Sequence, residues 1–172
     1  MIYIIVGKSC SGKTLMREYL EKKGFKGFEA SSFVELAMNK YNLNLEDLYK
    51  KFGKDFVSKQ ILKQIKGGSK SDIAISGLRT IEELNYFKKN TDAKVIGIYT
   101  SDKECFRRTI KRKREDFTND FFNFFSKKIC SDYELGLSKI LGVVDIWIEN
   151  DLEDIDKFYK EVDNLIKLKG AM

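Results

Sequence analysis

The feature that most constrains the fold is an eight-residue segment near the start of the chain, Gly7 to Thr14 (GKSCSGKT), together with its position between two regular patterns. The preceding run, Ile2 to Val6, is continuously apolar, which is typical of a parallel strand buried on both faces. From Lys13 onward apolar residues recur at helical spacing until Gly24. The sequence therefore predicts a buried strand, a glycine-containing loop and a helix in direct succession.

This loop fits the pattern G-x-x-x-x-G-K-[ST] at every defined position. In that pattern the glycines let backbone N–H groups surround a phosphate, the lysine reaches the terminal phosphates, and the final hydroxyl coordinates Mg²⁺. We therefore expect ATP or another nucleoside triphosphate, bound with Mg²⁺. The expected binding residues are Gly7, Lys8, Ser9, Cys10, Ser11, Gly12, Lys13 and Thr14.

The remainder of the chain alternates strand and helix patterns. Further strands are predicted at about 26–29, 72–76, 94–99 and 143–148, and helical patterns lie between and after them. Strands alternating with helices predict a parallel α/β sheet with helices on both faces. The predicted fold class is a three-layer α/β/α arrangement around a five-stranded parallel sheet.

Several helix boundaries can be predicted from local chemistry. A helix should begin at Ser31 or Ser32, and the helical stretch from 45 to 65 should weaken at Gly53. Thr80 is expected to cap one helix, and Ser101 with Glu104 has the spacing of a capping box for another. A further helical stretch is predicted at about 118–137, and a closing amphipathic helix over 152–166.

Composition excludes several kinds of chemistry. The 172 residues contain no His, so the chain can build neither a Ser-His-Asp triad nor a His-containing zinc site. Its three Cys include no C-x-x-C pair, and Cys10 is assigned no redox role. No apolar run approaches the roughly 18 residues of a membrane span. We expect one domain, 1–172, in a cytoplasmic protein without membrane contact.

Positive charge is concentrated in one segment. Arg107 to Arg114 (RRTIKRKR) holds six basic residues and no acid, which equals the formal net charge of +6. A balanced chain with one basic patch favours a local polyanion site over a general nucleic-acid surface. The alternative left open is a nucleotide-binding switch or a nucleic-acid-associated NTPase, in which this segment grips a polymer.

The order of motifs resembles the small P-loop kinases of the nucleoside monophosphate kinase and dephospho-CoA kinase type, and most closely an archaeal dephospho-CoA-kinase-like group. Besides the loop, the resemblance rests on SGLRTIEELNYF after the third strand, on the basic run, on DYELG at 132–136, and on Asp145 and Asn150 around the fifth strand. It covers nearly the whole chain. It implies the P-loop NTPase fold with the loop strand central, an acceptor-binding region at about 30–66, and an Arg-rich helical lid at about 105–128.

The resemblance also implies roles for individual residues. It matches Arg79 to the arginine that grips the acceptor phosphate, and Arg108, Arg112 and Arg114 to lid arginines that would act with Lys13 in catalysis. Phosphoryl transfer depends mainly on positioning and on cations that arrive when the site closes, which suits such residues. The expected activity is ATP-dependent transfer to a small acceptor bearing a hydroxyl or phosphate. A nucleoside monophosphate or a dephospho-CoA-like compound is the expected acceptor, and the oligomeric state stays open.

Three positions depart from the pattern of these kinases. Ser76 ends the third strand where an acid usually organises the Mg²⁺ shell, so it is expected to be an uncharged metal ligand with Thr14. Ser32 occupies the place of an acid near the acceptor, with Glu29 as the nearest substitute and candidate base. Glu35 replaces an arginine and would repel a phosphate acceptor.

Five phenylalanines fall within the nine residues 117–125, shortly after the basic run. Phe117, Phe121 and Phe125 stand at i, i+4 and i+8, which predicts a packed helix face rather than a base-stacking platform. Phe122 and Phe124 lie elsewhere on the helix, where a subunit contact or a lid hinge would use them.

Overall fold

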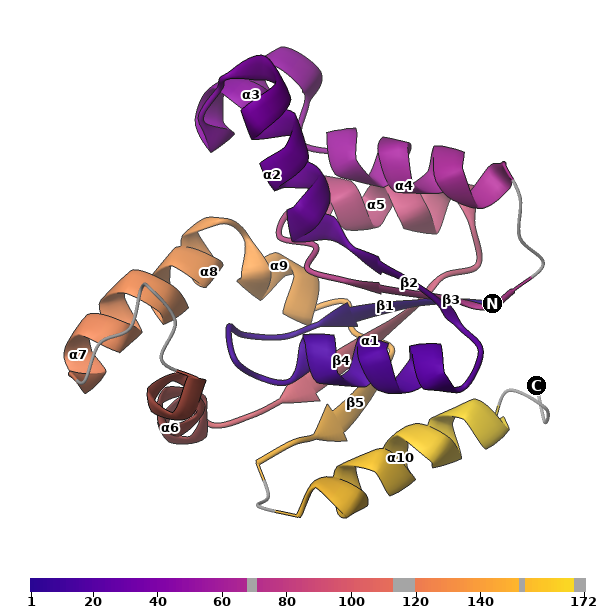
Figure 1. Ribbon diagram of the computed structural model, residues 1–172, viewed down its shortest axis with the longest axis vertical. Helices are drawn as coiled ribbons and strands as arrows, with labels where there is room; N and C mark the ends of the chain where they lie inside the picture. Colours follow the sequence, from indigo (N-terminus) through magenta and orange to yellow (C-terminus); the bar gives the residue numbers. More distant parts are fainter. Residues whose placement is uncertain (68–70, 113–119, 152–153, 169–172) are drawn as a thin grey trace.

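The computed structural model describes residues 1–67, 71–112, 120–151 and 154–168. Within them five parallel strands form one sheet in the order β2-β3-β1-β4-β5, so the strand that precedes the loop is central (Figure 1). The strands are β1 (Ile2–Val6), β2 (Lys26–Glu29), β3 (Ile73–Ser76), β4 (Lys94–Tyr99) and β5 (Ile146–Glu149). The predicted sheet is confirmed, although the fifth strand begins at Ile146 rather than at 143.

Helices follow the strands as the sequence predicts. They are α1 (Lys13–Lys22), α2 (Ala30–Tyr41), α3 (Leu45–Phe52), α4 (Phe56–Lys66), α5 (Ile81–Asn90), α6 (Asp102–Arg112), α7 (Phe121–Phe124), the π-helix η1 (Phe125–Cys130), α8 (Ser131–Glu134), α9 (Leu137–Leu141) and α10 (Ile155–Leu168). Figure 1 shows α1 and α10 on one side of the sheet and α4 and α5 on the other. The α2–α3 pair and the α6–α8 segment project from the body.

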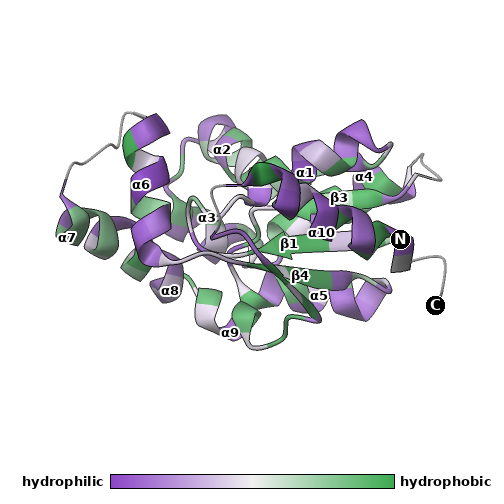
Figure 2. Cartoon of the chain, turned by 90° about the horizontal axis from the view of Figure 1, so that it is seen from below, coloured by the Kyte–Doolittle hydropathy of each residue, from purple (hydrophilic) through white to green (hydrophobic). Residues whose placement is uncertain are grey.

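The two sheet faces carry separate cores. On one face, Met16 and Leu20 of α1 and Phe158 of α10 pack against Tyr3 and Ile5. On the other, α2, α4, α5 and α9 cover alternate strand residues, among them Ile4, Val6, Ile75 and Val95. Burial on both faces explains the continuous apolar strands, and Figure 2 shows them green between helices that turn purple sides outward.

Local signals fix most helix ends. The 45–65 stretch divides at Gly53, and Thr80 with Glu83 forms a capping box for α5. Two expectations need correction. Helix α2 begins at Ala30, directly after β2, without a side-chain cap. At α6 only half of the predicted box forms, because the Glu104 carboxylate binds Arg107 and Arg108 while the Ser101 N–H donates to Asp151.

The phenylalanine face was predicted wrongly. Phe124 is the buried member, packed with Cys105 and Ile129, whereas Phe121 and Phe125 are each 38% exposed. Phe122 is 82% exposed. The continuation of α7 as a π-helix alters the residue spacing along this segment, so a strict i, i+4, i+8 pattern does not describe its inner face. Phe117 lies outside the described residues.

None of the described helices is both long enough and apolar enough to cross a membrane.

Candidate functional site

The loop between β1 and α1 has the backbone that its glycines permit. Gly7 has φ 152°, and a Cβ there would lie 2.6 Å from the Ser11 Oγ. Gly12 has φ 107° and would place a Cβ 2.2 Å from the Asn150 Nδ2. Cys10 also adopts a positive φ, 65°. Both glycines are therefore required by conformation and by space, which leaves loop N–H groups at the N-terminus of α1.

The back of the loop is held by β5 and α6. Asn150 donates from Nδ2 to the Ser11 carbonyl at 2.7 Å, and Arg108 donates to the Asn150 carbonyl at 2.6 Å. The Arg108 Nε also donates to Glu104. The structure thus brings Arg108 to the loop but directs its guanidinium to backbone carbonyls, and Arg108 does not line the cavity described below. This arrangement points to a role in holding the loop.

Lys13 curls over the loop from the first turn of α1. Its ammonium donates to the carbonyls of Gly7 and Lys8 at 2.8 and 2.6 Å. Burial lowers the pKa of Lys13, and the carboxylates of Asp132 and Glu29 act in the opposite direction. The ammonium therefore feels the charge of two carboxylates while its hydrogen bonds go to backbone carbonyls, which it can exchange for phosphate oxygens.

Two loop residues are tied to the α6–α8 segment. The Ser9 N–H donates to the Asp132 carboxylate of α8 at 2.6 Å, and Lys8 forms an ion pair with Asp102 of α6. The Asp132 carboxylate therefore already accepts a hydrogen bond from one of the loop N–H groups that would bind an anion. Lys8, although part of the motif, directs its ammonium to α6.

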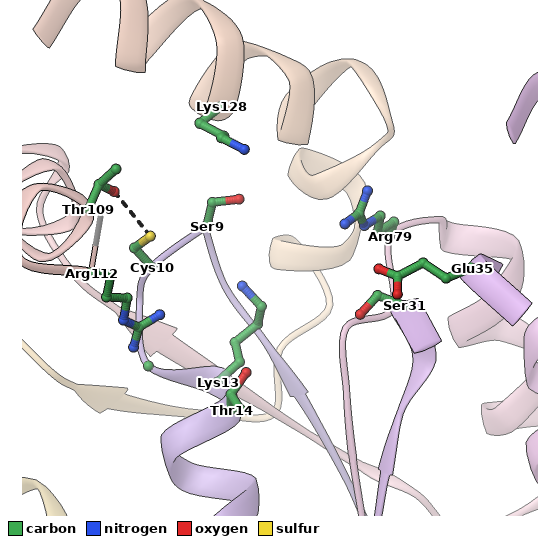
Figure 3. Close-up of a pocket in the computed structure, with 11 residues that line it drawn as sticks. Ser9, Cys10, Lys13, Thr14, Ser31, Glu35, Arg79, Thr109, Arg112 and Lys128 are labelled. Atoms are coloured by element: carbon green, nitrogen blue, oxygen red, sulfur yellow. Dashed lines mark hydrogen bonds between the residues drawn. The ribbon is translucent and has the colours of Figure 1, made fainter. Parts of the chain in front are cut away.

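A cavity of about 350 Å³ opens over the loop (Figure 3). Its lining residues come from the loop, α1, α2, the end of β3, α6 and η1: Ser9, Cys10, Gly12, Lys13, Thr14, Ser31, Glu35, Arg79, Thr109, Arg112 and Lys128. Figure 3 shows Arg112 and Lys128 on one side and Arg79 and Glu35 on the other. The structure thus brings Arg79, Arg112, Lys13 and Thr14 together as predicted. Arg114 lies outside the described residues.

The ends of β2 and β3 supply a hydroxyl–carboxylate cluster beside this cavity. Glu29 stands opposite Ser76 in the strand register and accepts its hydroxyl at 2.6 Å. The other Glu29 oxygen accepts the Ser31 hydroxyl at 3.1 Å, and the Arg17 Nε lies 3.6 Å from the carboxylate. The Glu29 carboxylate of β2 thus lies beside Ser76, the position at the end of β3 where an acid was expected.

Ser31, rather than Ser32, faces the site. Ser31 lines the loop cavity and both smaller cavities beside it, whereas Ser32 is exposed and lines none of these three. Helix α2 begins at Ala30, before both of the serines at which its start was expected. The predicted substrate-binding role of Ser32 therefore does not fit its placement.

Two smaller cavities adjoin the loop cavity. A space of about 90 Å³ is lined by Lys13, Glu29 and Asp132, among others. A chamber of about 200 Å³ lies between α2, α3 and the end of β3, lined by Ser31, Val34, Glu35, Met38, Leu45, Tyr49 and Arg79. Arg79 and Ser31 line all three cavities, so these two residues stand where the cavities meet.

A buried carboxylate fixes the backbone that carries Arg79. Glu83 accepts the N–H groups of Arg79 and Thr80 at 2.8 and 3.0 Å. Burial raises the pKa of Glu83, and these backbone hydrogen bonds oppose that rise. The α5 capping box thus fixes the backbone of Arg79, and the exposed Arg79 side chain lines the cavities.

Sequence reasoning missed several lining residues. The missed residues have no recognisable spacing relative to the loop. They are Lys128, Asp132 with its contact to Ser9, and the chamber wall of Val34, Met38, Leu45 and Tyr49. The one available signal was the DYELG segment, which pointed to Asp132 without giving its partner.

Comparisons with known proteins agree with this fold. No known family profile matches the sequence. A UPF0200 protein of Methanococcus maripaludis is 26% identical over 94% of this chain and 97% of its own length. A UPF0200 protein of Sulfurisphaera tokodaii is 27% identical, covering 96% of each chain.

Two solved structures that share this architecture are a shikimate kinase and a gluconokinase. Shikimate kinase from Bacteroides thetaiotaomicron superposes with a TM-score of 0.65 at 14% identity, over 99% of this chain and 98% of that one. A gluconokinase from Sinorhizobium meliloti gives 0.57 at 12% identity, over 96% and 91%. The chain therefore has the α/β/α fold of the P-loop kinases, and in sequence it is similar to the UPF0200 proteins of archaea.

Proposed function

We propose that the protein is an ATP-dependent phosphotransferase that acts on a small acceptor. The observation that carries this proposal is the meeting of three cavities at Arg79 and Ser31: one over the phosphate loop, one beside Glu29, and one enclosed by α2 and α3. A nucleotide site that opens directly into a second chamber is what transfer between two bound molecules requires.

ATP would place its phosphates against the loop and its terminal phosphate toward Lys13. The loop supplies N–H donors at the start of α1, and Lys13 supplies a charge that exchanges its two backbone carbonyls for phosphate oxygens. Arg112 and Lys128 line the same cavity from α6 and η1, where they can neutralise charge on the transferred group.

One oxygen donor beside the loop fits Mg²⁺. Thr14 presents a hydroxyl to the cavity, whereas Ser76 is fully buried, lines none of the three cavities and donates a hydrogen bond to Glu29. The predicted metal-binding role of Ser76 therefore does not fit its placement. Thr14 would hold the ion, with water and phosphate oxygens completing its shell, and the bound ion neutralises phosphate charge.

Glu29 would accept the acceptor's proton. The acceptor oxygen forms a bond to the γ-phosphorus, the bond from that phosphorus to the bridging oxygen breaks, and ADP leaves with the electron pair. The hydroxyl proton passes to the Glu29 carboxylate, which Ser31, Ser76 and Arg17 hold in place. Arg79 and Arg112, on opposite sides of the cavity, stabilise the charge spread over the equatorial oxygens.

The polymer-binding alternative receives less support. Arg107 and Arg108 both bind Glu104, and Arg112 lines the cavity, so two of these arginines are paired with a carboxylate and the third faces the loop. A nucleoside monophosphate or a dephospho-CoA-like compound, expected from the sequence, stays a prediction for the acceptor.

The proposal is tested by calorimetry of Mg-ATP binding followed by a coupled ADP-release screen of acceptors that includes those two classes. We expect Lys13→Ala to lower Mg-ATP affinity at least about tenfold, and Glu29→Gln to lower acceptor-dependent turnover about 10²-fold with ATP binding retained. Lys54→Ala, which removes an exposed lysine away from the loop, is the matched control. Undiminished Mg-ATP binding by the Lys13 variant would contradict the site, and ADP release that only RNA or DNA stimulates would favour the alternative.

A further inference from the structure

The lining of the 200 Å³ chamber between α2 and α3 indicates which kind of acceptor fits there. Its role as an acceptor site rests on the proposed function. Its inner wall is formed by Val34, Met38, Leu45 and the ring of Tyr49. Its mouth, shared with the loop cavity, is formed by Ser31, Glu35 and Arg79. An acceptor placed here would bury an apolar group inside and keep its polar groups toward the loop.

The size of the chamber limits that apolar group. A dry cavity of about 150 Å³ is known to accept one benzene molecule, whereas pockets for drug-sized ligands begin at about 300 Å³. At about 200 Å³ the chamber accommodates one six-membered ring or a short branched chain. A nucleoside with both base and ribose exceeds it.

The mouth carries opposite charges side by side. Arg79 and Glu35 are both exposed at the mouth, and Figure 3 shows them on the same side of the cavity. Within the described part of the chain, no hydrogen bond or ion pair joins the side chain of either residue to another residue, although the Arg79 charge also opposes the rise that burial causes in the pKa of the Glu83 carboxyl. A doubly charged phosphate at this mouth would gain from Arg79 and lose to Glu35, whereas a ligand with one positive and one negative group would pair with both.

The Tyr49 hydroxyl adds a hydrogen-bonding group to the chamber wall. It is buried and has no hydrogen-bond partner among the described residues. A buried hydroxyl without a partner is costly unless a ligand or water supplies one. A water molecule beside a bound acceptor would supply that partner.

We propose that the acceptor is a compact hydroxylated zwitterion of the amino-acid type. Its apolar group of at most one ring fills the chamber, its carboxylate pairs with Arg79, its ammonium pairs with Glu35, and its hydroxyl faces the loop. The acceptor oxygen takes the γ-phosphoryl group, ADP leaves with the bridging electron pair, and the proton goes to Glu29, as in the reaction above. Glu35 is then a residue that determines specificity against phosphate-bearing acceptors.

The experiment compares phenylserine with four related probes. Phenylserine carries the ring, hydroxyl, ammonium and carboxylate. The compound 3-hydroxy-3-phenylpropanoate lacks only the ammonium, 2-amino-1-phenylethanol lacks only the carboxylate, and threonine replaces the ring by a methyl group. The fourth probe, 2-hydroxy-2-phenylethyl phosphate, carries a phosphate in place of both the ammonium and the carboxylate. Binding is measured by calorimetry on the full chain with a non-hydrolysable Mg-ATP analogue, so the result does not depend on turnover.

We expect phenylserine to bind at least about tenfold more tightly than each of the other four probes. Glu35→Gln should weaken phenylserine and 2-amino-1-phenylethanol by about 10- to 100-fold, leave 3-hydroxy-3-phenylpropanoate within about twofold, and tighten the phosphate probe. Glu46→Gln, which removes a carboxylate ion-paired with Lys50 on α3, is the matched control and should change none of them.

Tighter binding of the phosphate probe than of phenylserine by the unmodified protein overturns the inference, as does the absence of binding by all three ammonium-bearing probes, phenylserine, 2-amino-1-phenylethanol and threonine. An equal effect of Glu35→Gln on all five probes overturns it too. If the Glu35-dependent preference is present but no probe receives phosphate, the acceptor inference holds and the phosphotransferase proposal fails. If the unmodified protein and Glu35→Gln transfer phosphate to the probes with equal efficiency, the phosphotransferase proposal stands and the acceptor inference fails.

Discussion

The carboxylate of Asp132 accepts the backbone N–H of Ser9 at 2.6 Å, across 123 positions of sequence. The donor belongs to the loop that would bind phosphate, so helix α8 already places a negative charge against an anion-binding group. Asp132 also acts electrostatically on Lys13, and both residues line the same 90 Å³ space. A bound triphosphate would meet this carboxylate at close range.

Asp132→Asn should therefore tighten Mg-ATP binding. The amide oxygen can still accept the Ser9 N–H, but the repulsion of phosphate charge is gone, which is worth on the order of 1 kcal/mol, or about three- to tenfold in affinity. Calorimetry measures the change, and Asp92→Asn, an exposed carboxylate on the α5–β4 connection, is the control. Weaker binding by the Asp132 variant would show that the carboxylate supports the nucleotide-bound loop instead.

Arg112 provides a test of the lid. If it stabilises the transferred group, Arg112→Ala should lower turnover by about 10²- to 10³-fold and change ATP affinity little, because the charge it holds develops in the transition state. Lys111→Ala, the neighbouring exposed cation, should leave turnover close to that of the parent protein. If both variants instead lose nucleic-acid affinity equally and keep full turnover, the segment is a polymer-binding face.

Lys13 should make ATP binding depend on pH. Burial lowers its pKa, and only the ammonium form neutralises phosphate. Affinity should therefore fall as pH rises through this lowered pKa, and above it binding should take up a proton. Calorimetry between about pH 8 and pH 10, in buffers with different ionisation enthalpies, measures both effects. Binding that is independent of pH, without proton uptake, would contradict the lowered pKa.

Gly12→Ala should reduce stability as well as nucleotide binding. A methyl group there meets the Asn150 amide at 2.2 Å and a backbone with φ 107°. Gly24→Ala is the matched control, since its φ of 92° imposes the backbone strain with no atom within 4 Å of the new Cβ. We expect urea unfolding to give a larger loss for Gly12, by about 1–3 kcal/mol, and partial recovery when Asn150→Ala is added. Equal losses at both glycines would show that Asn150 does not constrain the loop.

The sequence was informative where a local pattern decides the structure. The β1–loop–α1 unit follows from an apolar run, two required glycines and a helical repeat, all close together at the start of the chain. The Thr80 capping box and the break at Gly53 also depend only on neighbouring residues. These features were predicted correctly because no distant contact competes with them.

Competing and distant contacts explain what was missed. Glu104 had the spacing to cap α6, but the guanidinium groups of Arg107 and Arg108 offered its carboxylate stronger charge-assisted hydrogen bonds. The partner carbonyl of Arg108 on Asn150 lies 42 positions away, so local spacing could not reveal this contact. The resemblance pointed to Ser32, and sequence position alone could not show that the adjacent Ser31 faces the site.

The most direct test of the central claim is the fate of the γ-phosphate. The protein is incubated with Mg-ATP and the acceptor panel in ¹⁸O-labelled water, and the products are analysed by mass spectrometry, with Lys13→Ala as the blank. We predict a new phosphate ester on a small acceptor, free of ¹⁸O and formed in equal amount with ADP. Release of ¹⁸O-labelled inorganic phosphate alone, at a rate that no small acceptor changes, would contradict a phosphotransferase.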